Sequence, residues 1–238
     1  MIVARKPDVN PDDYCYDTGL KFGSAAGKYL LEKILMRQAG FLPDAVDNKQ
    51  AYKETAKHNT FSNTKEILRR KKQNKELNND LTHITSDQWL LPEDLRKAFH
   101  EDLPAWLLGL DADTTKTLVQ MSHGGDYFSI HSDSKRCSSM FMLLQGQEQE
   151  TNWHRNTEPF EVLNPARIPD HDKIEHVVTA VIQPYRWYVF NHAAWHGVSG
   201  FVDGGARVHV SLDFKHLSAA DLVKIVKSHA PHRTPVEC

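Results

Sequence analysis

The chain has 238 residues, of which 40% are hydrophobic and 25% are charged, so it can fold around a core of its own. Its formal net charge of −2 does not favour a nucleic acid or a membrane surface as a partner. No apolar run reaches membrane-spanning length, no signal pattern begins the chain, and the cysteines are few and scattered. We therefore expect a cytoplasmic protein without disulfides.

Residues 1–112 predict a helical and irregular region that supports the rest of the chain. Its first 23 residues look irregular, with two prolines and several aspartates. A helix is expected from Ala25 to about Ala39, because apolar residues recur there at helical spacing. Ser24 can cap the start of this helix and Gly40 can end it.

Residues 44–80 are polar and have little apolar periodicity, so we predict a lid over the mouth of the core. A basic run at residues 69–72 could instead contact phosphate, but acidic neighbours favour a solvated face. Another helix is expected to begin near Pro92 and to reach Trp106 despite Pro104.

The sequence pattern of residues 113–216 is typical of a β domain. Short extended runs alternate with Gly-rich and Pro-containing turns, which is typical of a sandwich or barrel, and the jelly roll is the usual host of mononuclear metal sites. The predicted strands are 117–121, 127–131, 139–144, 177–182, 187–190 and 207–214. A last helix, from Ser218 to about Ser228 within residues 217–238, closes a mainly β fold with flanking helices.

The most informative residues are His131, Asp133 and His196. In an extended segment His131 and Asp133 point to the same face, and His196 could join them from a neighbouring strand. Two histidines and one carboxylate leave half an octahedron open, which is typical of a non-haem Fe(II) oxygenase. His192 is an alternative distal ligand, but His196 leads into a strand and is preferred. In a histidine-rich chain, His131 could also be an ordinary histidine and Asp133 the start of a turn.

Arg207 opens a strand on which it shares one face with His209 and Ser211. An arginine on a core-facing strand is costly unless it is paired, and its planar fork matches a carboxylate. A small dicarboxylate held by Arg207 at one end and by the metal at the other would offset that cost. This arrangement predicts 2-oxoglutarate as a cosubstrate. Gln120, if it points inward, could also bind that cosubstrate.

The set His131-x-Asp133, His196 and Arg207, with Ser211 on the same face, resembles the Fe(II)/2-oxoglutarate-dependent dioxygenases. The sequence around the two histidines is most similar to the aspartyl/asparaginyl β-hydroxylase and cis-prolyl hydroxylase branch. The resemblance covers roughly residues 115–215 and implies a double-stranded β-helix, or cupin-like jelly roll, with Ser211 beside the cosubstrate. The longer interval between Asp133 and His196 departs from that branch, with an insertion expected in residues 145–175.

The resemblance further implies that Fe(II), 2-oxoglutarate and O2 are used to hydroxylate an sp3 carbon. A carboxylate at position 133, where related halogenases have a small residue, favours hydroxylation over halogenation. Desaturation and ring closure begin with the same hydrogen abstraction and stay open. The expected substrate is a small polar molecule, an amino acid or its derivative. Alternatives are the same chemistry on a peptide, protein or nucleotide, and a non-catalytic jelly-roll binding module.

Substrate contacts are expected from two places in the β region. Arg136, just after the ligand pair, could hold a substrate carboxylate, although it could equally be a solvated arginine. Asn152, Trp153 and His154 lie in a row of residues that can hydrogen-bond or stack, with Trp153 on the opposite face from its neighbours. The alternative for this row is a plain strand with one buried tryptophan.

Overall fold

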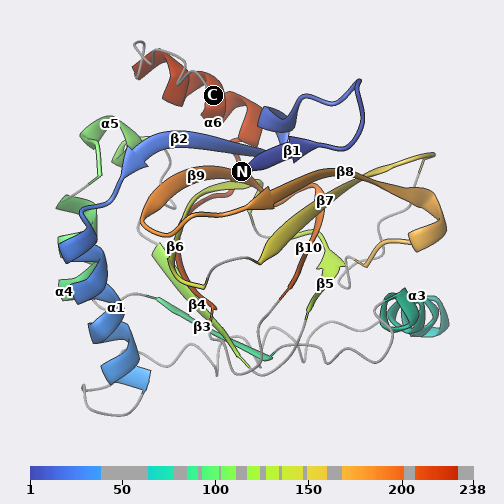
Figure 1. Cartoon of the computed structure of the whole chain (residues 1–238), viewed down its shortest axis with the longest axis horizontal. Coiled ribbons are helices and arrows are strands. Elements are labelled where there is room, and N and C mark those ends of the chain that lie inside the picture. The colour runs from blue at the N-terminus through green and yellow to red at the C-terminus, as the bar shows by residue number, and fades with distance from the viewer. Residues whose placement is uncertain are drawn as a thin grey trace.

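The structure is a computed structural model that describes most of the chain. The described residues are 1–38, 64–77, 85–90, 93–101, 103–110, 117–123, 127–133, 136–146, 149–159, 168–200 and 207–229. Within them two antiparallel sheets pack face to face, and helices flank the sheets (Figure 1).

The five-stranded sheet holds β1 (Ile2–Ala4), β8 (Ile174–Val181), β7 (Glu150–Asn156), β10 (Trp195–Ser199) and β5 (Phe128–His131), in that order. The six-stranded sheet has the order β2 (Cys15–Lys21), β9 (Arg186–Asn191), β6 (Ser138–Gln145), β11 (Arg207–Phe214), β4 (Thr117–His123) and β3 (Thr85–Leu90). Neighbouring strands in both sheets of the described residues pair antiparallel.

The chain crosses repeatedly between the two sheets from β4 to β11. β4, β6, β9 and β11 belong to the six-stranded sheet, and β5, β7, β8 and β10 belong to the five-stranded sheet. This repeated crossing between two antiparallel sheets is the topology of a double-stranded β-helix. The predicted fold class, a mainly β jelly roll with flanking helices, is confirmed.

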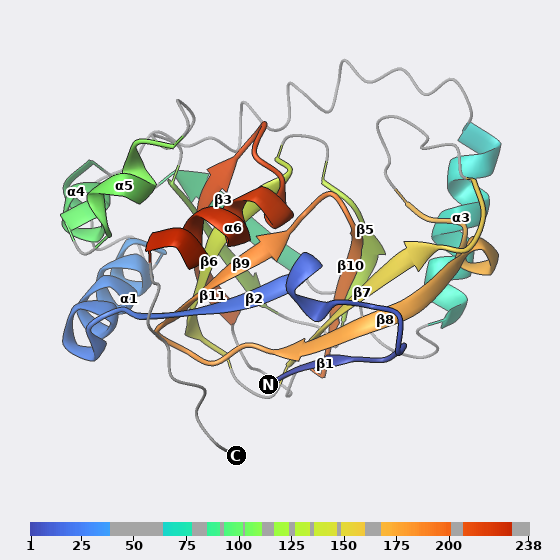
Figure 2. The ribbon, with the colours of Figure 1, turned by 90° about the horizontal axis from the view of Figure 1, so that it is seen from above.

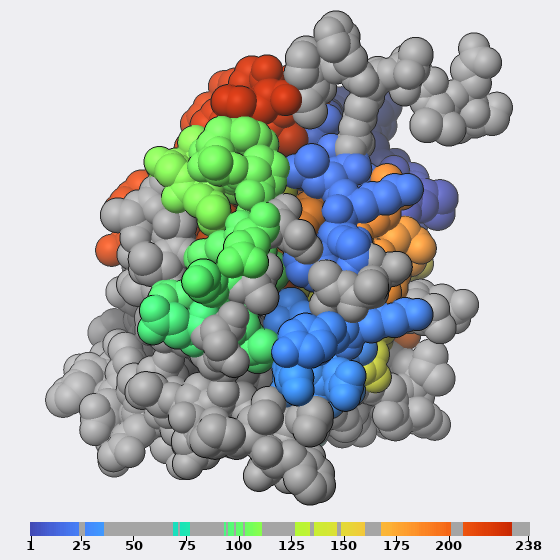
Figure 3. Space-filling view, turned by 90° about the vertical axis from the view of Figure 1, so that its left-hand side faces the viewer, coloured from blue at the N-terminus to red at the C-terminus, as the bar shows by residue number. Residues whose placement is uncertain are grey.

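Helices cover the outer face of the six-stranded sheet. α1 (Ser24–Gln38), α4 (Glu93–Glu101) and α5 (Ala105–Leu108) lie on one side of the barrel, and α6 (Ala219–His229) lies above it (Figures 1 and 3). Seen from above, α3 (Thr64–Leu77) stands at the opposite end of the molecule, near β5 (Figure 2). Short 3-10 turns, η1 (Pro11–Asp13) and η3 (His171–Lys173), precede β2 and β8. None of the described helices combines the length and the apolar character needed to cross a membrane.

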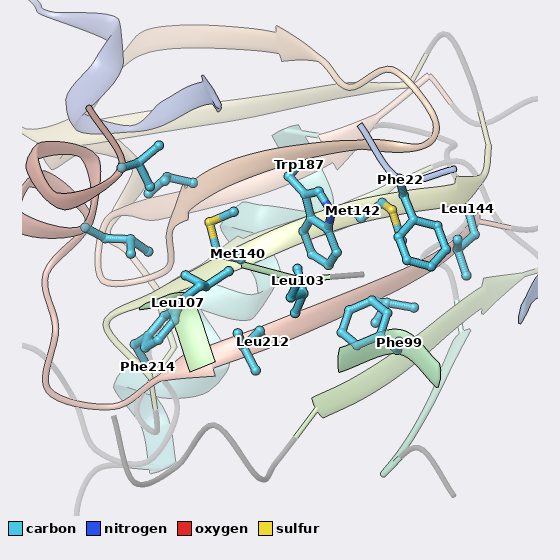
Figure 4. Close-up of a cluster of buried hydrophobic side chains, with 14 of the residues drawn as sticks. Phe22, Phe99, Leu103, Leu107, Met140, Met142, Leu144, Trp187, Leu212 and Phe214 are labelled. Carbon is cyan, nitrogen blue, oxygen red and sulfur yellow. The ribbon is translucent and has the colours of Figure 1, made fainter. Parts of the chain in front are cut away.

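The larger hydrophobic core lies between these helices and the six-stranded sheet (Figure 4). Its centre is aromatic: the ring of Phe99 from α4 lies 5.2 Å from that of Trp187 on β9 and 5.9 Å from that of Phe22 (centroid distances). A second core fills the barrel between the two sheets and includes Phe141, Trp153 and Phe190. Strands β6, β9 and β11 of the six-stranded sheet are therefore buried on both faces.

In strand β11 the residues alternate between the two buried faces. Val208, Val210, Leu212 and Phe214 belong to the core beneath the helices. The alternate residues Arg207, His209, Ser211 and Asp213 are also buried and face the barrel interior. The predicted division of this strand into an apolar face and a polar face is therefore confirmed.

Two expectations for the N-terminal region were wrong. Residues 1–23 contain β1 and β2, which extend the two sheets by pairing with β8 and β9. These strands were missed because each is specified by a distant partner and carries no clear alternation of its own. The helix predicted from Pro92 to Trp106 is two helices, since Pro104 precedes α5 and cannot donate the hydrogen bond that continuation of α4 requires.

The other predicted elements agree with the structure. Six predicted strands appear as β4, β5, β6, β8, β9 and β11, and α1 occupies most of the predicted first helix. The last helix is capped as expected, because the Asp221 backbone N–H donates to Ser218 Oγ at 3.1 Å. β3 was not predicted.

The proposed lid, residues 44–80, is described only in α3, and its other residues lie outside the described part of the chain. α3 is attached to the segment before β8: Arg69 Nη2 pairs with Asp170 Oδ2 at 2.8 Å, and Arg70 Nη1 donates to the Ile168 carbonyl at 3.3 Å. Arg69 and Arg70 of the basic run thus make structural contacts, whereas Lys72 is exposed, as expected of a solvated face. The lid role and the division of the chain at residues 112 and 216 stay predictions.

We predict that Leu212→Ala lowers the free energy of unfolding by about 2–5 kcal/mol, because Leu212 is fully buried beneath the helices. Urea unfolding measures the loss. The control Lys224→Ala, on the exposed side of α6, should change stability by less than about 0.5 kcal/mol. Equal values for the two variants would mean that the helices do not pack on β11.

Candidate metal centre

The three residues predicted to bind a metal lie together at one end of the barrel. β5 and β10 are neighbours in the five-stranded sheet, and His131 is directly opposite His196 in their register. The two imidazole rings lie 4.4 Å apart between centroids. Asp133 follows β5 by two residues, and its Oδ1 lies 3.8 Å from His131 Nε2.

A fourth residue, His192, lies in the same cluster. One ligand atom from each of Asp133, His192 and His196 can be chosen so that all three lie within 4.8 Å of one another. His192 follows the end of β9 and is buried against Phe190, with ring centroids 4.5 Å apart. The sequence offered His192 only as a substitute for His196, whereas the structure places both at the site. This Asp/His/His cluster could bind a metal ion.

The rings of His131 and His196 are oriented in the same way. His131 Nδ1 lies 2.8 Å from the Ser129 carbonyl oxygen, and His196 Nδ1 lies 3.0 Å from the Ala194 carbonyl oxygen. A carbonyl only accepts hydrogen bonds, so each Nδ1 carries a proton, and in the neutral ring the lone pair is on Nε2. This is the tautomer of a histidine that binds a metal through Nε2.

Burial sets the protonation states of the cluster. It lowers the pKa of His196 well below its ordinary value, and the neighbouring His131 lowers it further, so His196 is neutral at pH 7. Burial would raise the pKa of the Asp133 carboxyl. Arg136 and the hydrogen bond from His192 outweigh this effect, so the pKa of Asp133 lies well below its ordinary value. At neutral pH the site therefore offers an imidazole and a carboxylate in the forms that bind metals.

Arg136 connects the cluster to β11. Its Nε donates to Asp133 Oδ2 at 2.7 Å, and its Nη1 lies 3.0 Å from both carboxylate oxygens of Asp213 and 3.3 Å from Ser211 Oγ. The substrate carboxylate predicted to bind Arg136 would have to compete with two carboxylates of the protein itself. The same contact engages Ser211, the residue expected beside the cosubstrate. These positions favour Arg136 as a structural link between Asp133 and Asp213 over Arg136 as a substrate contact.

Arg207 points into the barrel and is only 4% exposed. Its Nη2 reaches Thr151 Oγ1 at 3.5 Å, and its Nε and Nη1 have no hydrogen-bond partner among the described residues. Its guanidinium carbon lies 5.6 Å from the centre of the Phe141 ring. Burial lowers the pKa of Arg207 to about 10, so it is still a cation at pH 7. No acidic partner for this cation appears in the part of the chain that the structure describes.

Arg207 and the cluster lie at different depths of the barrel. In β7, Thr151, which Arg207 contacts, is two residues before Trp153, which pairs with His196. Two strand residues span about 7 Å. Between these levels His209 stacks on Phe141 with ring centroids 4.4 Å apart, and its buried Nδ1 has no partner among the described residues. Unpaired buried polar atoms are costly, so this part of the barrel favours a polar ligand.

The other predicted contacts divide between the two faces of the sheets. Asn152 and His154 line a hollow of about 240 Å³ on the outer face of the five-stranded sheet, together with His176. Trp153, between them, is buried in the barrel and donates its Nε1–H to the Asn191 carbonyl at 3.1 Å. A substrate at the metal cluster therefore could not touch Asn152 or His154 from this side of the sheet, and Trp153 is part of the core.

Gln120 lies in β4, opposite His209 of β11 in the register. Its strand position agrees with the prediction that it could lie near a cosubstrate. Its side chain is outside the part that the structure describes, so the role of Gln120 stays a prediction.

Comparison with known proteins finds only distant similarity. No protein-family model matches the chain, and no curated protein matches its sequence. The chain is similar to the crystal structure of vicilin from Corylus avellana (hazelnut), at 7% identity over 56% of this chain and 30% of that chain, with a TM-score of 0.30. It is also similar to the X-ray structure of E. coli ycfD, at 12% identity over 61% of this chain and 38% of that chain, with a TM-score of 0.33.

This chain thus matches about a third of the length of each of these proteins. At such TM-scores the similarities carry no information on function, which has to be inferred from the geometry of the site.

We predict that His131→Ala and His196→Ala each abolish binding of a divalent metal such as Co(II), because each removes one Nε2 ligand and leaves the fold intact. Isothermal titration calorimetry measures the binding, and circular dichroism checks the fold. The control is His154→Ala, on the outer face of the same sheet. Retained metal binding in either of the first two variants would contradict the assignment of that ligand.

Arg136→Gln should weaken metal binding about 10- to 100-fold, because it removes the cation that keeps Asp133 ionised and oriented. The matched control is Arg155→Gln. Arg155 also bridges two carboxylates, those of Asp8 and Glu175, but it lies at the protein surface. If the two variants bind metal equally well, the ion pair between Arg136 and Asp133 does not affect metal affinity.

Proposed function

We propose that this protein is an Fe(II)- and 2-oxoglutarate-dependent oxygenase that hydroxylates an sp3 carbon of a small polar molecule, an amino acid or its derivative. The jelly-roll fold is compatible with such an enzyme, and the cluster of Asp133, His192 and His196 could bind a metal ion. His131 adjoins this cluster, with its Nε2 3.8 Å from Asp133 Oδ1. The proposal assigns His131, Asp133 and His196 as the iron ligands and Arg207 as the residue that anchors the cosubstrate.

The choice of metal follows from the kind and number of ligands. Two imidazole nitrogens and one carboxylate oxygen suit divalent first-row metals and leave three coordination positions for exchangeable ligands. A structural zinc site would be closed by four protein ligands. The open set supports non-haem iron, because iron in these sites has to bind a cosubstrate and O2 at the same time.

The buried cation of Arg207 is the single observation on which the cosubstrate assignment depends. A guanidinium that is 4% exposed, with two nitrogens unpartnered among the described residues, calls for an anion that the described chain does not supply. The separation of about 7 Å along the strands, between the level of Arg207 and that of His196, suits a five-carbon dicarboxylate. 2-Oxoglutarate has a carboxylate for Arg207 and a keto acid for the metal.

The chain's own residues prepare the site for this chemistry. When bound, Fe(II), 2-oxoglutarate and O2 supply the oxidation of an unactivated C–H bond. Arg207 would hold one carboxylate of the cosubstrate, and the barrel core, with Phe141 and Phe190, would keep water from that part of the site. His131 and Asp133, whose side chains are 27% and 22% exposed, would hold the metal at the more accessible part of the site. The substrate would therefore approach on their side and not past the deeply buried Arg207.

The proposed function is tested without knowledge of the substrate. Anaerobic addition of Fe(II) and 2-oxoglutarate should give a weak visible charge-transfer band, which a non-catalytic binding module would not give. In air, slow conversion of 2-oxoglutarate to succinate should follow. Mass spectrometry of a panel of free amino acids, scored for the gain of one oxygen, then identifies the substrate class. Absence of both the band and succinate would overturn the proposal.

Arg207→Gln should raise the 2-oxoglutarate concentration needed for half-maximal succinate formation by roughly 10- to 150-fold, since a charge-assisted pair contributes about 1.5–3 kcal/mol. The control Arg186→Gln removes an arginine of β9 that pairs with Asp17 outside the barrel and should leave this requirement unchanged. An unchanged requirement in Arg207→Gln would mean that another cation holds the cosubstrate.

A further inference from the structure

His192 has a position in the cluster that neither the ligand set nor the barrel core explains. It is only 3% exposed, and both of its ring nitrogens have a neighbour. Its Nδ1 lies 2.8 Å from Asp133 Oδ2, and its Nε2 lies 2.8 Å from Ser139 Oγ. Its backbone carbonyl also accepts a hydrogen bond from the Asp133 backbone N–H at 2.9 Å.

These contacts define the tautomer of His192. Two lone pairs would repel each other at 2.8 Å, so Nδ1 carries the proton that faces the ionised Asp133 carboxylate. Nε2 then has the lone pair, which accepts a hydrogen bond from the Ser139 hydroxyl. The neutral imidazole thus makes both contacts without a change of charge. To bind a metal, His192 would have to give up one of them.

His131 and His196 are arranged differently. Each directs its Nδ1–H to the carbonyl oxygen of the residue two positions before it. Their Nε2 atoms are thereby prepared for a metal, whereas the Nε2 of His192 is directed at Ser139. Proximity alone therefore groups three histidines around Asp133, but hydrogen bonding separates His192 from the other two.

The two oxygens of Asp133 also have different surroundings. Oδ2 accepts a hydrogen bond from Arg136 Nε at 2.7 Å, and His192 Nδ1 lies 2.8 Å from the same oxygen. Oδ1 is the oxygen that faces His131 Nε2, at 3.8 Å. A carboxylate held in this way on one oxygen can coordinate through the other oxygen only, and then occupies a single corner of the coordination octahedron.

We propose that His192 is a positioning residue of the metal centre and not a ligand: with Arg136 it holds Asp133 Oδ2, so that Oδ1 alone coordinates. The inference rests on the proposed function, because it takes His131, Asp133 and His196 as the ligands. A single-oxygen carboxylate keeps three corners open for the cosubstrate and O2. Ser139 acts one step further away, by keeping the Nδ1 of His192 protonated.

The experiment counts the histidines that bind the metal. In the Co(II) form of the full chain, the N–H proton of each coordinating imidazole gives a strongly shifted, exchangeable proton NMR signal. We expect two such signals in the wild type, from the Nδ1–H groups of His131 and His196, and the same two in every His192 variant that binds cobalt. Three signals in the wild type, with one lost in the variants, would overturn the inference and make His192 a ligand.

Affinity for Co(II) gives the second readout. His192→Leu removes the side-chain contacts with Asp133 and Ser139 and should weaken Co(II) binding about 10- to 100-fold, as expected for the loss of a residue that orients a ligand. His192→Asn places an amide N–H near the position of Nδ1 and should restore binding towards the wild-type value. Unchanged affinity in His192→Leu would overturn the positioning role.

Ser139→Ala provides a variant that leaves the imidazole in place. It should weaken Co(II) binding less than His192→Leu does and keep two shifted signals, whereas affinity below that of His192→Leu would contradict the order of the contacts. Failure of the wild type to bind Co(II) or 2-oxoglutarate would be a failure of the proposed function itself. A wild type that binds both but shows three signals would refute only the role of His192.

Discussion

Strands β6, β9 and β11 of the six-stranded sheet are buried on both faces, and this constraint determines what the rest of the structure has to do. Helices α1, α4, α5 and α6 take the apolar residues of one face, so the alternate residues of these strands must point into the barrel. On β11 these inward residues are Arg207, His209, Ser211 and Asp213, all of them buried. Each polar residue on a buried face costs stability unless it has a partner.

The inward polar residues of β11 have partners at one end of the barrel and lack some of them at the other. At one end Asp213 and Ser211 are satisfied by Arg136, which also holds Asp133. At the other end Arg207 has one long contact, to Thr151, and His209 keeps an unpartnered Nδ1 among the described residues. The end at which Ser211 and Asp213 have partners is the end with the cluster around Asp133, whose geometry is already set by the protein. The unsatisfied part is where a ligand would supply the missing partners, which is why the site fits both a metal and an anion.

Hydrogen bonding within the cluster separates roles that proximity does not. His131, His192 and His196 all lie near Asp133. His131 and His196 direct Nδ1–H at backbone carbonyls, whereas His192 directs it at Asp133 itself. The resulting arrangement has an inner shell that can take a metal and an outer shell of Arg136, His192 and Ser139 that orients it. Outer shells of this kind commonly fix the direction and the charge of the ligands that they contact.

By itself the sequence predicted the jelly-roll class, the two faces of β11 and the proximity of His131, Asp133 and His196, because strand alternation and residue chemistry are local properties. The roles of these residues and of Arg207 stay predictions. The sequence could not determine the partners of those residues. That Arg136 turns to Asp133 and Asp213, that Asn152 and His154 lie on the outer face of their sheet, and that His192 reaches Asp133 depend on registers between strands far apart in the chain. For the same reason the sequence did not predict β1 and β2, because a short edge strand is specified by the strand beside it and not by its own composition.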